Sequence, residues 1–284
     1  MLLRPMSATG ASPTRANTDS PYSPIAGFRP PLSSSFALYA RSILFNVLFY
    51  VNIVVRMIFA LPTLLLPYSF LLGVLRRYAR STLWLLRVVC GTNVEWRGRE
   101  KIPAGACLVA CKHQSLWETF ALFILLDDPT FVLKRELMWL PLFGWLARKA
   151  RMIPVDRGGR TAALARMVAS ARREIARSRK IVIFPEGTRR APDAEPRYMS
   201  GVAYLYSETG LACVPLALNS GLFWPRRSLL RYPGTVLVQA LDPIPPGLDK
   251  RTFLARLENV LEDATARLVA EARKEDSGIG KGHL

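Results

Sequence analysis

The chain has 284 residues, of which 50% are hydrophobic, so it can bury a sizeable core in one or two domains. Its 39 Lys and Arg residues against 21 Asp and Glu residues give a formal net charge of +18, which suits anionic membrane lipid, nucleic acid or phosphorylated small substrates. Four cysteines without a Cys-x2-Cys spacing or nearby histidines give poor support to a zinc site or a redox pair. We expect buried thiols in a reduced compartment, with Cys107 and Cys111 on one face of a strand.

Residues 1–35 are rich in Ser, Pro, Thr and Ala and show no hydrophobic period, which predicts a disordered tail. The apolar region begins only after this tail. A signal peptide would place it earlier, so secretion is not indicated.

Residues 36–89 are dominated by Leu, Val, Ile, Phe and Tyr. The charge-free stretch 57–75 would form about 28 Å of helix, near the thickness of a bilayer core. Pro62 and Pro67 remove backbone donors within it, which favours two helices that break at these prolines. Arginines flank both ends, so the positive-inside rule places both ends in the cytoplasm. We predict a membrane-embedded helical hairpin at 36–89, with a single span as the alternative.

Short apolar runs separated by amphipathic stretches follow, which is typical of an α/β domain at 90–276. Helical spacing of apolar residues predicts one helix between the third and fourth runs and another at 252–272. The tail at 277–284 is expected to be loose. The runs are 106–111, 130–133, 152–155, 181–184, 212–218 and 235–240.

Histidine is the most informative residue type, because the chain has two and His283 lies in a polar tail. His113 follows the predicted strand 106–111, where open α/β sheets present their ligand-binding loops. In one continuous helix Glu118 would point about 140° away from His113, so His113 should precede the helix that the Ser115-x-x-Glu118 capping box starts. The two side chains can then meet. The alternatives are a Glu118 that only caps and a His113 on a surface loop.

Residues 184–189, with the sequence Phe-Pro-Glu-Gly-Thr-Arg, come directly after the apolar strand 181–183. Gly187 lets the backbone approach a ligand closely, and Arg189 can bind a phosphate through two parallel hydrogen bonds. We interpret the segment as a phosphate-binding loop. An ordinary ion pair between strand and loop is the alternative.

Four ordered blocks together resemble the glycerolipid acyltransferase family, and within it the bacterial 1-acylglycerol-3-phosphate acyltransferases. The resemblance covers roughly residues 90–220, and the blocks in order are far more specific than a lone His-x4-carboxylate. It implies an α/β fold with a mixed sheet flanked by helices, and an N-terminal membrane-embedded helix pair. The blocks are 112–118 with His113 and Glu118, 134–137, 184–189, and 214–217.

The family's chemistry implies that His113 is the general base and that Glu118 holds its tautomer. The implied reaction is direct transfer of a fatty acyl chain from acyl-CoA or acyl carrier protein to the sn-2 hydroxyl of 1-acyl-sn-glycerol 3-phosphate, giving phosphatidic acid. It needs no cofactor and no metal. The implied location is the cell inner membrane, in contact with anionic lipid, with the catalytic domain on the cytoplasmic side.

The family pattern also implies that Lys134, with Arg135, and Arg189 bind the phosphate of the acceptor. It implies that Glu186, Gly187 and Thr188 shape the loop that carries Arg189. Two positions depart from it. Glu118 stands where Asp is commonest, and Met199 stands where many relatives have Lys, which weakens the assignment of the acceptor. Pro215 belongs to the fourth block, which in the family is often linked to positioning of the acyl donor or the acceptor, and a role as a strand-end turn residue is equally supported.

Three other functions compete with this interpretation. Acylation of another lyso-lipid, such as lyso-ornithine lipid, would make less use of the phosphate-gripping residues. A hydrolase would need a nucleophile, and Ser115 lacks a Gly-x-Ser-x-Gly elbow. A membrane-tethered nucleic-acid-binding protein would explain the charge, but the basic residues are interspersed in an α/β pattern and match no recognition motif, so no nucleic-acid partner is expected.

Overall fold

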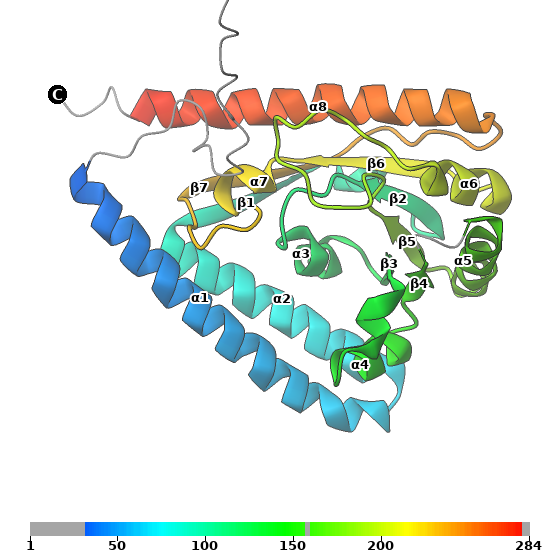
Figure 1. Cartoon of the computed structure of the whole chain (residues 1–284), viewed down its shortest axis with the longest axis horizontal. Coiled ribbons are helices and arrows are strands. Elements are labelled where there is room, and N and C mark those ends of the chain that lie inside the picture. Colours follow the sequence, from blue (N-terminus) through cyan, green and yellow to red (C-terminus); the bar gives the residue numbers. More distant parts are fainter. Residues whose placement is uncertain (1–31, 157–159, 280–284) are drawn as a thin grey trace, which may run out of the picture.

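The computed structural model describes residues 32–156 and 160–279, and within them seven strands form one mixed sheet in the order β1-β7-β6-β2-β5-β3-β4 (Figure 1). The six predicted apolar runs all become strands. Strand β1, at the edge of the sheet, was not predicted. Asn93, Glu95 and Arg97 alternate with its other residues, so it contains no continuous apolar run. The strands are β1 Thr92–Arg97, β2 Cys107–Cys111, β3 Pro129–Lys134, β4 Ile153–Val155, β5 Lys180–Ile183, β6 Cys213–Leu218 and β7 Gly234–Ala240.

The strand directions decide where the site lies. β6 and β7 are antiparallel, whereas β6, β2, β5, β3 and β4 are parallel neighbours, with Val109 opposite both Val182 and Val214. The segments that follow β2, β3, β5 and β6 therefore emerge at one edge of the sheet, as in other parallel sheets that present ligand-binding loops there.

Helices cover both faces of the sheet (Figure 1). Along β2, Cys107, Val109 and Cys111 enter one apolar cluster, whereas Leu108 and Ala110 enter another. The first cluster includes side chains of α1, α2 and α3, and the second those of α5, α6 and α8. The helices are α1 Leu32–Ala60, α2 Tyr68–Cys90, α3 Glu118–Leu125, α4 Phe143–Lys149, α5 Arg160–Ile175, α6 Ser200–Thr209, α7 Ser220–Phe223 and α8 Lys250–Ile279, with short 3-10 turns η1 Leu61–Leu64, η2 Arg99–Lys101 and η3 Arg135–Trp139.

Helices α1 and α2 form a hairpin that breaks at the predicted prolines. Pro62 lies in η1 and Pro67 precedes the first residue of α2. The side chain of Asn52 joins the two helices by donating to the hydroxyl oxygens of Ser81 and Thr82, each at 3.0 Å.

The prediction of a membrane-embedded helix pair is corrected by the composition of α2. In the part of the chain that the structure describes, only the segment Phe36–Leu64 is long and apolar enough to cross a membrane. The charge-free stretch 57–75 straddles the turn between the helices, so it does not form one span. Helix α2 is amphipathic because four arginines interrupt its apolar residues: Arg76, Arg77, Arg80 and Arg87.

Helix α1 also belongs to the core of the α/β domain. Phe45 and Phe49 are buried and meet the Trp224 ring edge-on, with centroids 5.3 and 5.2 Å away. Arg231 is buried beside them, donates to the Asn46 side chain at 2.8 Å, and stacks over Trp224. Burial lowers the pKa of Arg231 to about 10.

The ends of the chain differ from the expected boundaries. Helix α1 begins at Leu32, before the predicted end of the tail at residue 35, and α8 continues to Ile279, into the segment expected to be loose. Residues 1–31 and 280–284 of the two predicted tails lie outside the described residues.

Candidate active site

His113 lies just beyond the end of β2 and is fixed by the loop that follows β5. Its backbone N–H donates to Glu186 Oε2 at 2.8 Å, and its carbonyl accepts from the Arg190 N–H at 2.8 Å. Its ring stacks on Phe184, with centroids 4.0 Å apart and an interplanar angle of 18°. The loop expected to bind phosphate thus also positions the histidine.

Glu118 meets the His113 ring as expected. The helix begins at Glu118, so His113 precedes it, and His113 Nδ1 lies 2.8 Å from Glu118 Oε1. Glu118 is fully buried, and its Oε2 accepts from the hydroxyl of Ser220 at 2.9 Å. A carboxylate beside Nδ1 favours the tautomer that carries its proton there, which leaves Nε2 with a lone pair.

The capping role and the contact with histidine use the same oxygen. Glu118 Oε1 also accepts from the backbone N–H groups of Gln114 and Ser115, each at 2.8 Å. The Ser115 hydroxyl accepts from the N–H of Trp117 at 3.1 Å rather than from that of Glu118, so only the glutamate half of the predicted capping box forms. Four donors therefore compensate a buried charge that would otherwise be costly.

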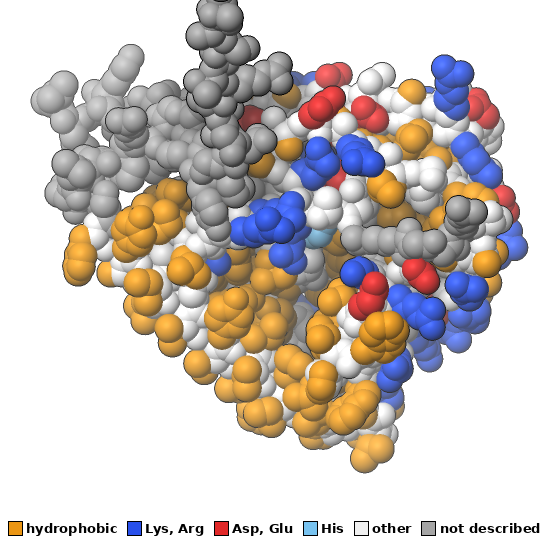
Figure 2. Space-filling model, viewed as in Figure 1, with side chains coloured by type: hydrophobic (Ala, Val, Ile, Leu, Met, Phe, Trp, Pro, Cys, Tyr) orange, Lys and Arg blue, Asp and Glu red, His pale blue; other side chains and the backbone are white. Residues whose placement is uncertain are grey.

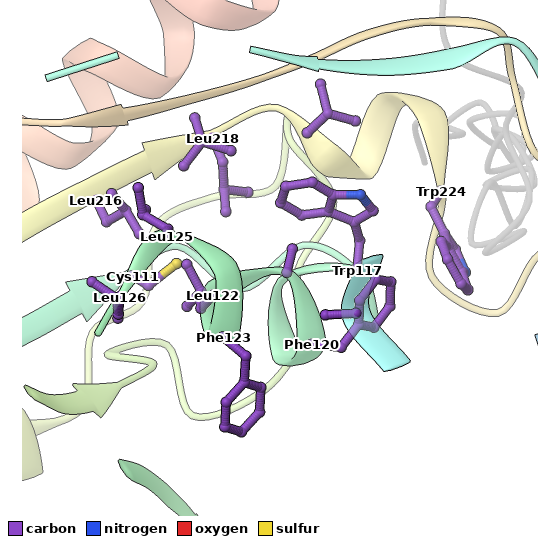
Figure 3. Close-up of a cluster of buried hydrophobic side chains, with 14 of the residues drawn as sticks. Cys111, Trp117, Phe120, Leu122, Phe123, Leu125, Leu126, Leu216, Leu218 and Trp224 are labelled. Carbon is purple, nitrogen blue, oxygen red and sulfur yellow. The ribbon is translucent and has the colours of Figure 1, made fainter. Parts of the chain in front are cut away.

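An apolar cluster holds α3 in place behind this carboxylate. Trp117, Phe120 and Leu122 of the α3 region lie among Cys111, Leu216 and Leu218 of the sheet (Figure 3). Cys107 and Cys111 share this face, as predicted, and all four cysteines are buried. Packing on β2 and β6 fixes the first turn of α3 and so the position of Glu118.

A cavity of about 910 Å³ opens beside His113 and has two chemically different ends. Basic side chains line the end near His113: Lys134, Arg189, Arg190 and Arg197. The other end lies between helices α1, α2 and α4, where mostly apolar side chains, including Met57, Leu71, Tyr78 and Leu146, form the wall together with Arg56 of α1. The cavity suits a ligand with an anionic head and a long apolar chain.

The loop after β5 contributes most of the predicted phosphate-binding residues to this cavity. Gly187, Thr188 and Arg189 all line it, and Gly187 has φ 66°, a left-handed conformation that favours glycine. Arg189 lines the cavity, and its backbone carbonyl accepts from Arg226 Nη1 at 2.7 Å. Burial lowers the pKa of Arg189.

Glu186 borders the cavity, but both its oxygens serve the protein. Oε1 lies 2.7 Å from Lys112 Nζ, and Oε2 accepts from the His113 N–H. Lys112 Nζ also lies 2.7 Å from Glu262 Oε1, which in turn accepts from the Tyr198 hydroxyl at 2.8 Å. Burial raises the pKa of Glu186. Its position supports the expected role in shaping the loop.

The second block divides between cavity and surface. Lys134 ends β3 and lines the cavity, with its Nζ 3.1 Å from Glu136. Arg135 is missing from the described residues that line the cavity, and its Nη1 lies 4.0 Å from Asp156. The structure thus brings His113, Lys134 and the 187–189 loop together but leaves Arg135 outside.

Two positions remain from the comparison with the family pattern: Pro215 of the fourth block, and Met199. Pro215 lies inside β6, pairs with Ala110, and accepts from the Leu241 N–H, so it has the role of a strand residue. Met199 lines the cavity, and a Cβ added at Gly187 would lie 3.2 Å from its Cγ. A thioether thus stands in the cavity where the family pattern commonly has an ammonium.

The sequence analysis missed several residues that complete the site. Lys112 lies within the first block but carries a buried ion pair rather than a ligand contact. Ser220 follows β6 at the same edge of the sheet as His113, and its contact with Glu118 depends on the strand order. Arg190 and Arg197 add basic character to the cavity. Within the described residues, no group of three or more His, Cys, Asp and Glu side chains could hold a metal ion.

Comparison with known proteins agrees with this geometry. A family model described as Acyltransferase matches residues 93–219. The chain is 30% identical over 191 residues to the lyso-ornithine lipid O-acyltransferase of Pseudomonas aeruginosa, with 61% of this chain and 72% of that protein covered. This chain belongs to the glycerolipid acyltransferase family.

This chain has two further similarities. It is 37% identical over 165 residues to the 1-acyl-sn-glycerol-3-phosphate acyltransferase of Pseudomonas aeruginosa, covering 58% of this chain and 64% of that protein, slightly less than two thirds. It has the fold of the 1-acyl-sn-glycerophosphate acyltransferase PlsC of Thermotoga maritima, with a TM-score of 0.67 and 20% identity, covering 81% of this chain and 98% of that one.

Proposed function

We propose that this protein transfers a fatty acyl chain from acyl-CoA or acyl carrier protein to the sn-2 hydroxyl of 1-acyl-sn-glycerol 3-phosphate. The observation that carries the proposal is the pairing of His113 with Glu118 beside a cavity whose wall combines basic and apolar side chains. The 37% identical relative named for this reaction supports the choice of acceptor.

The site residues suit direct transfer. The acceptor hydroxyl gives its proton to His113 Nε2 while its oxygen attacks the thioester carbonyl. The tetrahedral adduct collapses, the carbon–sulfur bond breaks, and the imidazolium returns the proton to the leaving sulfur. The Glu118 carboxylate stabilises the imidazolium between these two steps.

The substrate's parts match the two ends of the cavity. Lys134 and Arg189 would hold the acceptor phosphate, because both are cationic and both line the end near His113. Glu186, Gly187 and Thr188 would shape the loop that carries Arg189. Arg135 would contribute through the local positive field rather than through contact, since its side chain lies outside the cavity.

The decisive experiment offers the purified full-length protein both thioester donors and a panel of lyso-lipids. We expect phosphatidic acid as the main product from 1-acyl-sn-glycerol 3-phosphate, with the same panel identifying the donor. Absence of acyl transfer to every acceptor, with the protein folded, would refute the enzyme assignment.

Acylation of lyso-ornithine lipid is the second candidate. Met199 in the cavity and the relative of that name, which is covered over 72% of its length, both favour it. A higher kcat/KM for lyso-ornithine lipid in the same panel would establish it. Both candidates use the same His113 chemistry.

A membrane location follows from both candidates, because each acceptor is a lipid. The segment Phe36–Leu64 would insert into the cell inner membrane and keep the α/β domain on its cytoplasmic side, next to anionic lipid. Extraction should then need detergent. Release of the full-length protein by a carbonate wash would contradict insertion.

A further inference from the structure

A second apolar surface lies outside the α1–α2 hairpin, on η3 and α4. Residues 138–146 carry no charge, yet Trp139 and Trp145 are 66% and 52% exposed. Leu137, Leu140 and Phe143 are also exposed on this segment. So many large apolar side chains facing water in one short segment indicate an interaction surface.

The segment is rigid, so local unfolding does not explain its exposure. A Cβ added to Gly144 would collide with the carbonyl oxygen of Met138, which shows how closely η3 and α4 pack. The Gly144 N–H donates to the Leu140 carbonyl at 2.8 Å. Between them Leu142 has φ 61° and ψ −56°, a backbone conformation that is uncommon for a leucine. Met138 and Leu146 are buried beneath this turn.

The proposed substrate accounts for only part of this surface. Leu137, Leu140 and Phe143 line the cavity, and a bound acyl chain would cover them. Trp139 and Trp145 are not among the described residues that line it, so their rings remain exposed when the cavity is filled.

The surface is continuous with the outer side of the hairpin. Leu146 and Ala150 pack in one cluster with Ala60 and Leu71, and Lys149 Nζ donates to the Leu64 carbonyl at 3.1 Å. Figure 2 shows hydrophobic side chains along the face formed by α1 and continuing to the region of α4, with Lys and Arg side chains beside them. Basic residues flank this segment along the chain, with Lys134 and Arg135 before it and Arg148, Lys149 and Arg151 after it.

We propose that the η3–α4 segment is a second membrane contact, which inserts Trp139 and Trp145 into the boundary between headgroups and acyl chains of an anionic phospholipid bilayer. Trp rings favour this boundary because they combine a large apolar area with an N–H donor. The adjacent basic side chains complement anionic headgroups. The proposal rests on the proposed function, in that the acceptor is a membrane lipid.

This contact would place the cavity mouth against the lipid. Leu137, Leu140 and Phe143 line the cavity, are exposed, and belong to the same short segment as the two tryptophans, so an acyl chain could pass from the bilayer into the cavity along apolar side chains.

Depth measurements on the full chain test the contact directly. All four natural cysteines are buried, so a fluorophore can be attached selectively to Trp145→Cys, with Val47→Cys on exposed α1 and Arg256→Cys on exposed α8 for comparison. Each protein is reconstituted into vesicles of phosphatidylethanolamine and phosphatidylglycerol. We expect spin-labelled lipids to quench the labels at 47 and 145, and iodide to quench only the label at 256.

The two ways of failing are distinguishable. A label at 145 that iodide reaches, while lipid quenches the label at 47, would overturn the second contact and leave the insertion of the segment Phe36–Leu64 intact. If iodide reaches both labels, the second contact and the membrane location are both overturned.

A kinetic experiment tests the same contact without an attached fluorophore. In the double variant Trp139→Ser, Trp145→Ser, we expect KM for vesicle-embedded acceptor to rise about tenfold, because the surface loses apolar area, while kcat/KM for a water-soluble short-chain acceptor stays unchanged. The matched Trp139→Phe, Trp145→Phe variant should recover most of the loss. An equal loss with both acceptors, or no change in KM with vesicles, would overturn the proposal.

Discussion

The hydroxyl of Ser220 donates a 2.9 Å hydrogen bond to Glu118 Oε2, the carboxylate oxygen opposite the one that contacts His113. Both groups are fully buried, and Ser220 begins α7 directly after β6. His113, Glu118 and Ser220 thus form a chain of three side chains, from the loop after β2, the start of α3 and the start of α7. Ser220 is not among the described residues that line the cavity, so we expect it to act by positioning Glu118.

Removal of this hydroxyl should lower turnover. We expect Ser220→Ala to reduce kcat about 10- to 100-fold with little change in KM, since a hydrogen bond to a charged group contributes about 1.5–3 kcal/mol. Steady-state kinetics would measure the split. Ser228→Ala is the matched control, because that hydroxyl accepts from the Leu230 N–H and lies outside the chain to Glu118. A variant as active as wild type would show that the backbone donors alone hold Glu118.

His113→Ala should reduce turnover by about 10²- to 10⁴-fold, the range that general-base catalysis contributes. Glu118→Gln should retain the fold, because its amide oxygen can still accept from the N–H groups of Gln114 and Ser115. It should nevertheless reduce kcat by about 10²-fold, because the imidazolium loses its counter-charge. Single-turnover rates and thermal unfolding would be measured together. Loss of folding in Glu118→Gln, rather than of turnover, would assign Glu118 to capping alone.

Arg189→Ala should chiefly raise KM for a phosphate-bearing acceptor, because the guanidinium would hold the phosphate in ground and transition states alike. Arg189→Lys should recover only part of the loss, since Lys lacks the planar fork. The bond from Arg226 ends on the Arg189 backbone carbonyl, so both variants keep it.

Arg135→Ala provides the matched cation control for Arg189, because Arg135 lies outside the cavity. The comparison is KM for acceptors with and without phosphate. If Arg189→Ala impairs the phosphate-free acceptor equally, the side chain supports the loop and does not bind phosphate. Lyso-ornithine lipid then becomes the better-supported acceptor.

The buried carboxyl of Glu186 predicts a pH dependence of stability. Burial raises its pKa in the folded protein above the unfolded value of about 4.3. Folding therefore favours the protonated form, and this contribution is present below the unfolded pKa and is lost as the pH rises through the folded pKa. Glu186→Gln does not titrate at this position. We expect the unfolding temperature of wild type minus that of Glu186→Gln to decrease between pH 4 and pH 8. An increase would show that pairing with Lys112 outweighs burial.

Six of the seven strands that the structure describes were predictable because apolar runs of strand length alternate with helical patterns, and His113 because it follows one of these runs. The residues with which the site residues pair could not be predicted. The Lys112–Glu186 pair joins residues 74 positions apart, and the Ser220–Glu118 bond joins residues 102 apart, so their meeting depends on strand order. The same limit explains why α2 was expected to lie in the membrane. Its apolar residues Leu71, Ala79 and Leu86 are covered by other parts of the protein, which the sequence alone does not show.

The packing of α1 bears on how the enzyme can be shortened. The core around Trp224 and Arg231 also includes Phe45, Phe49 and Asn46 of α1. Deletion of the hairpin would therefore expose the face of α3 that packs against it, and would leave the Arg231 guanidinium among apolar rings without its hydrogen bond to Asn46. A soluble version therefore cannot be obtained by truncation at residue 90. It would have to keep α1 and replace only its outward residues, such as Tyr50, Val54 and Phe59, with polar ones.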